Sequence, residues 1–206
     1  MTMVNAPHTL MTNINQDELL DISIERVKKV PSPLLVIGLG GTGVNAVNTI
    51  KRVFAQRYVL PQTSDGQFIP VPSHTAYLGI DTDANSQGEL SSHEYLNITY
   101  PDIAHILDPQ FRNNLLTADE HAWVHQALNA AGDGIGAGGN RQAARLMLSR
   151  NYQQVYSAIR SALASILGRE HGDGEPLQRL EIVIVTGVCG GTGAGIFLDV
   201  PQIIRH

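Results

Sequence analysis

The sequence predicts an α/β fold with a doubly wound, mainly parallel sheet. Three short apolar runs, LLVIG, TAYLGI and LEIVIV, have the length and composition of buried parallel strands. A glycine-rich loop or an acidic turn follows each run. Stretches with apolar residues at three-and-four spacing alternate with these runs, which is the pattern of strands that are connected by helices.

The composition is that of an ordinary globular protein. The chain has 206 residues, of which 43% are hydrophobic, and this is enough for a packed core. Lys and Arg number 14 against 19 Asp and Glu, a net charge of −5 without a long basic run, so we expect no nucleic acid partner. Cys189 has no partner for an internal disulfide, and we see neither a signal peptide nor a membrane span. We therefore predict a cytoplasmic protein.

Three regions are predicted along the chain. Residues 1–16 are polar and aperiodic, as in a disordered leader, and residues 17–33 form an N-terminal helix and a linker. Residues 34–206 form the α/β domain, which begins with the strand LLVIG, a glycine loop and the helix VNAVNTIKRVFAQRYV.

The later elements continue this alternation. TAYLGIDTDAN is a second strand that runs into an acidic turn, whereas residues 86–130 are mixed: 95–99 can form a short strand, and 103–128 holds helical fragments without a clear frame. Residues 141–167 are strongly helical, and the strand LEIVIVTG then leads through a glycine loop into a final helix. Pro201 falls in the first turns of that helix, where proline is tolerated.

Glycine-rich loops are the main functional signal. GLGGTG and VCGGTGAG each follow a buried strand, and GDGIGAGGN precedes a helix. Ligands of open parallel sheets bind at the carboxyl ends of the strands, where bare glycine backbone donates N–H groups to phosphate oxygens. The loops therefore predict a polyphosphate ligand. Thr192 can add a hydroxyl bond, and the ribose, the base or a magnesium ion can be contacted by Asn45, Asp81, Asp83 and Asn140.

Simpler interpretations stay open for several of these residues. GxGxxG also occurs by chance, GAGGN can be a flexible turn, and the carboxylates of DTD can cap a turn. Cys189 is expected to be a small buried thiol, to which we assign no role. The two histidines of HAWVH lack a third ligand, so we predict no metal cluster. Arg141 and Arg145 lie one turn apart, where one can reach a phosphate or both can lie on a solvated face.

Four motifs in the order VIGLGGTGVNAV, GIDTDAN, GIGAGGN and VTGVCGGTGAG resemble the N-terminal half of the tubulin and FtsZ superfamily of GTP-binding proteins. The resemblance is closest to the bacterial tubulin-like proteins and runs from residue 34 to the C-terminus. It implies a Rossmann-like nucleotide-binding domain that is incomplete at its C-terminus. The last motif is similar to the tubulin signature, GGGTG followed by Ser or Thr and Gly, but Cys189 replaces its first glycine and Ala194 its hydroxyl residue. These departures concern affinity more than ligand class.

The resemblance also implies a role for each loop around GTP or GDP with a magnesium ion. The first loop passes close to the nucleotide with Gly40, Gly41, Thr42 and Gly43, and Asn45 lies beside the base or ribose. The phosphates or their metal lie near Asp81 and Asp83. The loop that senses the γ-phosphate corresponds to Ala137, Gly138, Gly139 and Asn140. The α- and β-phosphates are held by Gly190, Gly191, Thr192 and Gly193.

Activity and assembly are further implications of the resemblance. Hydrolysis in the family needs an acidic loop from a neighbouring subunit, which belongs to a second half that this chain lacks. We therefore expect nucleotide binding, no catalytic residue, and little or no turnover by this chain alone. Self-association into a filament or oligomer is expected of the full-length protein.

Three other interpretations are weighed against this one. In a Rossmann-type enzyme that binds NAD, the ribose acid would follow the first loop by about twenty residues, whereas Asp81 comes much later. An adenylating enzyme would prefer ATP, and it usually carries a catalytic cysteine or zinc-binding cysteine pairs downstream. A non-catalytic polymerising scaffold differs from a GTPase only in turnover.

Overall fold

The computed structural model describes residues 33–58, 75–125, 136–167 and 180–205, all within one unit that spans Ser32–His206. At its centre is a sheet of four parallel strands in the order β3-β2-β1-β4. The strands are β1 (Leu34–Leu39), β2 (Thr75–Asp81), β3 (Tyr95–Asn97) and β4 (Glu181–Thr186). This sheet confirms the predicted α/β fold, and β3 is the short strand considered for 95–99, although it ends at Asn97.

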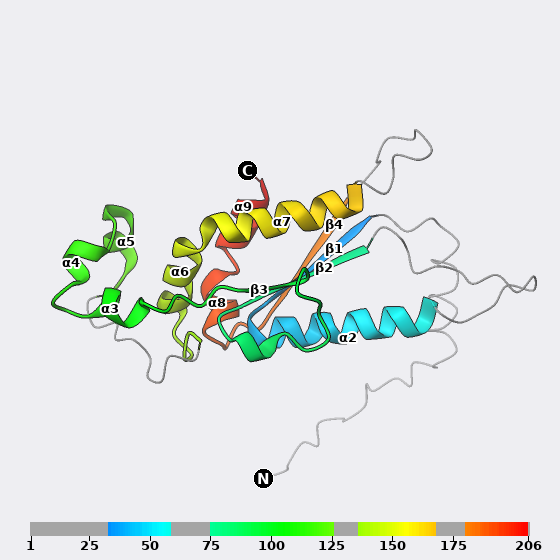
Figure 1. Cartoon of the computed structure of the whole chain (residues 1–206), viewed down its shortest axis with the longest axis horizontal. Helices are drawn as coiled ribbons and strands as arrows, with labels where there is room; N and C mark the ends of the chain where they lie inside the picture. Colours follow the sequence, from blue (N-terminus) through cyan, green and yellow to red (C-terminus); the bar gives the residue numbers. More distant parts are fainter. Residues whose placement is uncertain (1–32, 59–74, 126–135, 168–179, 206) are drawn as a thin grey trace, which may run out of the picture. The chain divides into compact units, whose positions relative to one another are not determined.

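Helices cover both faces of the sheet because the side chains of each strand alternate between the faces. On one face, Val36 packs with Val44 and Val47 of α2 (Gly40–Tyr58). On the other face, Leu35 and Ile37 belong to a cluster that includes residues of α7 (Tyr152–Leu167) and α9 (Asp199–Arg205). Figure 1 shows α2 and α7 on opposite sides of the strands. The fold is therefore doubly wound, as predicted.

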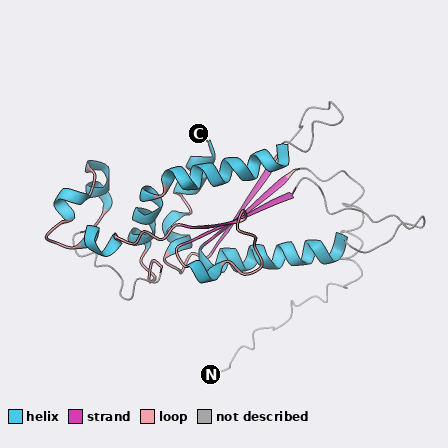
Figure 2. Ribbon diagram, in the orientation of Figure 1, coloured by secondary structure: helices cyan, strands magenta, loops and turns pink. Residues whose placement is uncertain are grey.

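Short helices make up the mixed region. It contains η1 (Ala84–Ser86), α3 (Ile103–Leu107), α4 (Arg112–Leu115) and α5 (Ala118–Trp123). Apolar side chains of α3 pack on Leu146 and Met147 of α6 (Arg141–Arg150), so this group has its own small core. Figure 2 shows α3, α4 and α5 beyond the end of the sheet. They confirm the helical fragments expected within 103–128.

Two predicted helices are interrupted. The stretch 141–167 divides into α6 and α7 at Asn151, whose buried side chain donates to the carbonyl oxygens of Ile98 and Met147. The helix after the last glycine loop divides into α8 (Thr192–Ile196) and α9. Pro201 lies in the first turn of α9, as expected.

Two predictions concern residues that the structure does not describe. The leader predicted for residues 1–16 and the helix predicted after it lie outside the described residues. No helix in the described ranges is both long and apolar enough to cross a membrane.

Candidate functional site

The four glycine-rich or acidic segments meet at the carboxyl edge of the sheet. Three of them follow β1, β2 and β4, which are parallel and end in register, with Leu39 opposite both Ile80 and Thr186. The fourth, the loop before α6, reaches the same edge through contacts with the other segments. The individual contacts are made mostly by backbone.

The loop after β1 lies against the loop after β4, which we call the signature loop (residues 187–193). Gly40 has a φ of 70°, and a Cβ added to it would lie 2.6 Å from the amide nitrogen of Gly193. A Cβ on Gly193 would in turn lie 2.6 Å from the carbonyl oxygen of Leu39. A Cβ on Gly43 would lie 2.3 Å from the carbonyl oxygen of Val185. Packing alone therefore requires glycine at these three positions.

The loop before α6, residues 136–140, lies against the same signature loop. A Cβ on Gly191 would lie 2.8 Å from the amide nitrogen of Asn140. Gly136, Gly138 and Gly139 have φ values of 64°, 52° and 78°, which other residues rarely adopt. The loop therefore has a left-handed backbone at three glycines and packs against the signature loop at Gly191.

Thr82 joins three of the segments, and the sequence did not point to it. Its side chain is buried, and its Oγ1 lies 2.7 Å from Oγ1 of Thr192 and accepts a hydrogen bond from the amide of Ala137 at 2.9 Å. The Thr99 hydroxyl also donates to the Thr82 carbonyl oxygen. The only sequence signal was its position between the two aspartates of DTD.

The two aspartates have different surroundings. Asp81 is buried, accepts a hydrogen bond from the amide of Thr82 at 2.7 Å, and has Oδ2 3.6 Å from a Cβ position on Gly41. Asp83 caps η1 by accepting from the amide of Asn85 at 2.9 Å. Asp81 therefore faces the first glycine loop, whereas Asp83 fulfils the capping role that was considered for it.

Tyr95 of β3 borders these carboxylates. Its hydroxyl donates to the carbonyl oxygen of Asp83. Burial raises the pKa of Tyr95 to about 12, with further contributions from the negative charges of Asp81 and Asp83. The acidic turn is therefore a region of negative potential.

Two glycines of the site have open space around them. A Cβ on Gly139 or Gly190 would meet no atom of the described residues within 4 Å, apart from those of its chain neighbours. The positive φ of Gly139 explains why this residue is glycine, but Gly190 has no positive φ. Neither packing nor backbone conformation therefore explains the glycine at position 190.

The remaining predicted residues lie at the margins. Thr42 is exposed and lies against Gly187. A Cβ added to Gly187 would be 3.0 Å from the Thr42 side chain. Asn45 and Gly138 are also exposed. Asn140 caps α6, because its side-chain oxygen accepts from the amides of Gln142 and Ala143.

The prediction for Cys189 is wrong. The thiol is exposed in the signature loop, because this loop leaves the sheet before α8 begins. His121 lies on the exposed side of α5 and His125 follows that helix. Within the described residues, no group of three or more His, Cys, Asp or Glu is arranged to hold a metal ion.

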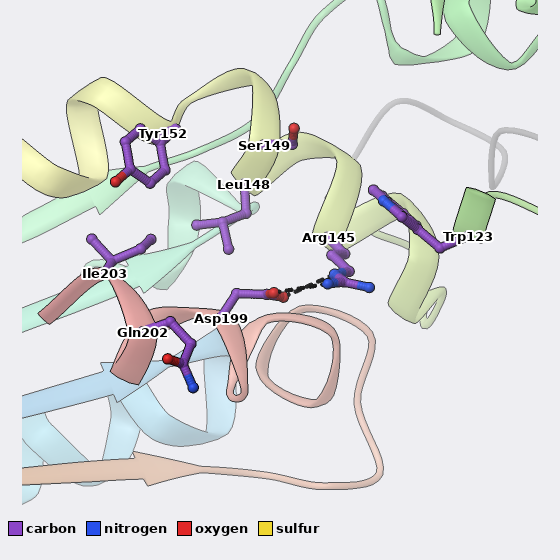
Figure 3. A pocket seen from close by; sticks show the side chains of 8 residues that line it. All are labelled: Trp123, Arg145, Leu148, Ser149, Tyr152, Asp199, Gln202 and Ile203. Atoms are coloured by element: carbon purple, nitrogen blue, oxygen red, sulfur yellow. Dashed lines mark hydrogen bonds and ion pairs between the residues drawn. The ribbon is translucent and has the colours of Figure 1, made fainter. Parts of the chain in front are cut away.

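The two arginines of α6 have different partners in the structure. Arg145 forms a bidentate ion pair with Asp199, with both N–O distances at 3.0 Å, and its guanidinium lies 4.8 Å from the ring centre of Trp123. These side chains line a pocket of about 330 Å³ whose lining includes no glycine-loop residue, and Figure 3 shows the ion pair among the lining side chains. Arg141 instead donates from Nη2 to the carbonyl oxygen of Val188 at 3.0 Å. Arg141 is therefore the member of the pair that lies at the signature loop.

Comparison with known proteins identifies the family. No curated protein matches the chain. Among solved structures, the chain is similar to TubZ of Bacillus thuringiensis serovar israelensis, crystallised as a GTPγS-form protofilament, with 18% identity and a TM-score of 0.32 over 89% of this chain. It spans 37% of the length of that TubZ chain. The family model described as "Tubulin like" matches residues 35–206, nearly the whole described unit, and the chain therefore belongs to the tubulin-like family.

Proposed function

We propose that this chain binds a guanine nucleotide, GTP or GDP, with its phosphates over the glycine loops at the carboxyl edge of the sheet. Membership of the tubulin-like family supports the proposal. The single structural observation that carries it is Gly190, which is glycine although no packing contact with the described residues and no positive φ requires it. A ligand that approaches the backbone closely accounts for this choice.

The surroundings of Gly190 suit phosphate oxygens. The amino end of α2 offers N–H groups without intrahelical partners and a partial positive charge, and this helix begins within the converging loops. The amino end of α6 adds partial positive charge there, although the Asn140 side chain already accepts from the amides of Gln142 and Ala143. Glycine-rich backbone at such positions approaches phosphate closely and hydrogen-bonds it from several directions. The predicted site residues are proposed to act together in this way.

Asp81 is the proposed contact for a magnesium ion that accompanies the phosphates. Mg²⁺ is commonly held by one or two carboxylates together with substrate phosphates and water. The carboxylate of Asp81 is buried beside Gly41, which is a suitable position for a direct or water-mediated contact. The magnesium would neutralise part of the phosphate charge.

Self-association and hydrolysis are proposed only for an assembly. The resemblance to tubulin and FtsZ implies that a neighbouring subunit supplies an acidic loop to the nucleotide. We accordingly propose that this chain alone shows little or no GTP turnover, and that nucleotide binding supports its assembly into a filament or oligomer.

The test is calorimetric titration of the purified chain with GTP, ATP and NAD in magnesium. We expect GTP to bind, and a Gly190→Val variant to lose at least about tenfold in affinity because its side chain occupies the space proposed for phosphate. Ala164→Val is the control, since it also introduces a valine, at an exposed position of α7, and should bind like the wild type.

Position 190 gives a cleaner test than the other signature glycines. A side chain on Gly191 or Gly193 would meet backbone atoms at 2.8 Å and 2.6 Å, so binding could be lost there through misfolding. If the folded wild type binds no GTP, or binds ATP or NAD in its place, the proposal is wrong. If Gly190→Val binds GTP as tightly as the wild type, the phosphates do not lie against Gly190.

A further inference from the structure

Arg141 is a basic side chain at the signature loop that the predicted set of site residues does not include. We propose that its guanidinium binds the terminal phosphate of a nucleoside di- or triphosphate in this site. The inference rests on the proposed nucleotide binding and adds to it the residue that recognises phosphate charge.

The backbone of Arg141 is fixed where two of the loops meet. Arg141 is the first residue of α6 and directly follows the loop 136–140. A Cβ on Gly195 of α8 would lie 2.4 Å from the Arg141 carbonyl oxygen, so the two helices touch backbone to backbone at this point. The side chain therefore starts from a well-defined position beside the signature loop.

The guanidinium lies at the rim of the open part of this loop. Its bond to the Val188 carbonyl oxygen, at 3.0 Å, places it two residues from Gly190. Val188 is 62% exposed and Arg141 is exposed as well, so a ligand can reach both. Arginine carries five N–H donors, and the bond to Val188 uses one of them. The others are available for a bidentate contact with phosphate.

The charge of Arg141 is not neutralised by a carboxylate in the described part of the chain. Its one hydrogen bond there is to a neutral carbonyl oxygen. Other basic residues are engaged in ion pairs, which join Lys51 to Glu94, Arg52 to Glu89, Arg145 to Asp199 and Arg150 to Glu120. A nucleotide beside Asp81 adds negative charge to a region that is already acidic, and Arg141 offsets part of it.

Helix stability does not account for Arg141. A cation at the amino end of a helix faces the positive end of the helix dipole, which is unfavourable. The first turn of α6 contains no acidic residue to compensate. A residue that slightly opposes the local structure is expected where function selects it.

The test compares Arg141→Gln and Arg141→Lys with the wild type. Calorimetry would measure the dissociation constants of GTP, GDP and GMP at two salt concentrations. For Arg141→Gln we expect a loss of about tenfold to a hundredfold for GTP, a smaller loss for GDP and almost none for GMP. The salt dependence of GTP binding should decrease, and lysine should restore part of the affinity. Arg160→Gln, on the exposed side of α7, controls for the change in net charge.

The possible failures can be distinguished. A wild-type chain that binds none of the three nucleotides overturns the proposed function and this role with it. Binding by the wild type and equally by Arg141→Gln overturns only the role of Arg141. An equal loss for GTP, GDP and GMP, with unchanged salt dependence, would also contradict it, because Arg141 would then merely support the loop through Val188.

Discussion

Gly190 and Gly193 lie three residues apart in the signature loop, but a side chain has opposite consequences at the two positions. At Gly193, an added Cβ would lie 2.4 Å from Oγ1 of Thr186 and 2.6 Å from the carbonyl oxygen of Leu39. At Gly190, it would meet no atom of the described residues within 4 Å beyond its chain neighbours. One glycine is required by the fold, and the other is left for a function to explain.

The first prediction compares Gly193→Ala with Gly190→Ala in urea unfolding. Gly193→Ala should lower the free energy of unfolding by about 2 kcal/mol or more, because the backbone of β1 must shift. Gly190→Ala should leave this free energy unchanged or raise it by up to about 1 kcal/mol, because alanine restricts the unfolded chain. Equal destabilisation by the two substitutions would contradict the described packing of the loop.

At the residue scale, the sequence pointed to candidate site residues more readily than to the contacts between them. The glycines and Asp81 stood out because their spacing and their place after strands are local patterns. Thr82 did not, since its contact with Thr192 joins residues 110 positions apart. The sequence did not distinguish Arg141 from Arg145. In the structure, Arg145 pairs with Asp199, whereas Arg141 donates to the carbonyl oxygen of Val188.

Among the elements, α2 is tied to the chain before β3 by a charged hydrogen bond. Lys51 donates to the carboxylate of Glu94, which also accepts from the amide of Ser91 at 2.8 Å. The backbone carbonyl of Glu94 accepts from the amide of Gly79 in β2 at 2.7 Å. Glu94 therefore connects a helix to two strands.

The second prediction concerns the pH dependence of this connection. Burial raises the pKa of Glu94, but the hydrogen bonds from Lys51 and Ser91 outweigh it, so the pKa lies below its ordinary value of 4.5. Its contribution to stability is therefore present above pH 4.5 and is lost as the pH falls through the lowered pKa. We expect Glu94→Gln to lower the unfolding free energy by about 1 kcal/mol at pH 7.

Unfolding measurements from pH 7 to pH 3 would check this prediction. The difference between wild type and Glu94→Gln should shrink as the solution becomes more acidic. Arg52→Gln, which removes the exposed ion pair with Glu89, is the control and should cost only a few tenths of a kcal/mol. A difference for Glu94→Gln that grows towards acid pH would contradict the stabilising role of the pair.

Element boundaries were less predictable than element types. Strands and helices were recognisable from apolar spacing, but the break between α6 and α7 was not. It depends on Asn151, whose side chain donates to Ile98, a residue far away in the sequence. The break between α8 and α9 was likewise not visible, although Pro201 suits the start of a helix.

Over the whole unit, strand order explains how distant motifs meet. The order β3-β2-β1-β4 places β1 between β2 and β4, so the segments that follow these three strands emerge side by side. Parallel pairing puts all three at the same edge. Alternation of strands and helices was enough to predict that the glycine loops meet at this edge, which is where ligands of such sheets bind.

The most direct test of the nucleotide site is amide hydrogen exchange with and without saturating GTP and magnesium. The account predicts slower exchange in all four segments, at residues 40–43, 81–86, 136–140 and 187–193, and no change around the pocket lined by Trp123 and Asp199. Slower exchange confined to that pocket, or no change anywhere although GTP is bound, would contradict it.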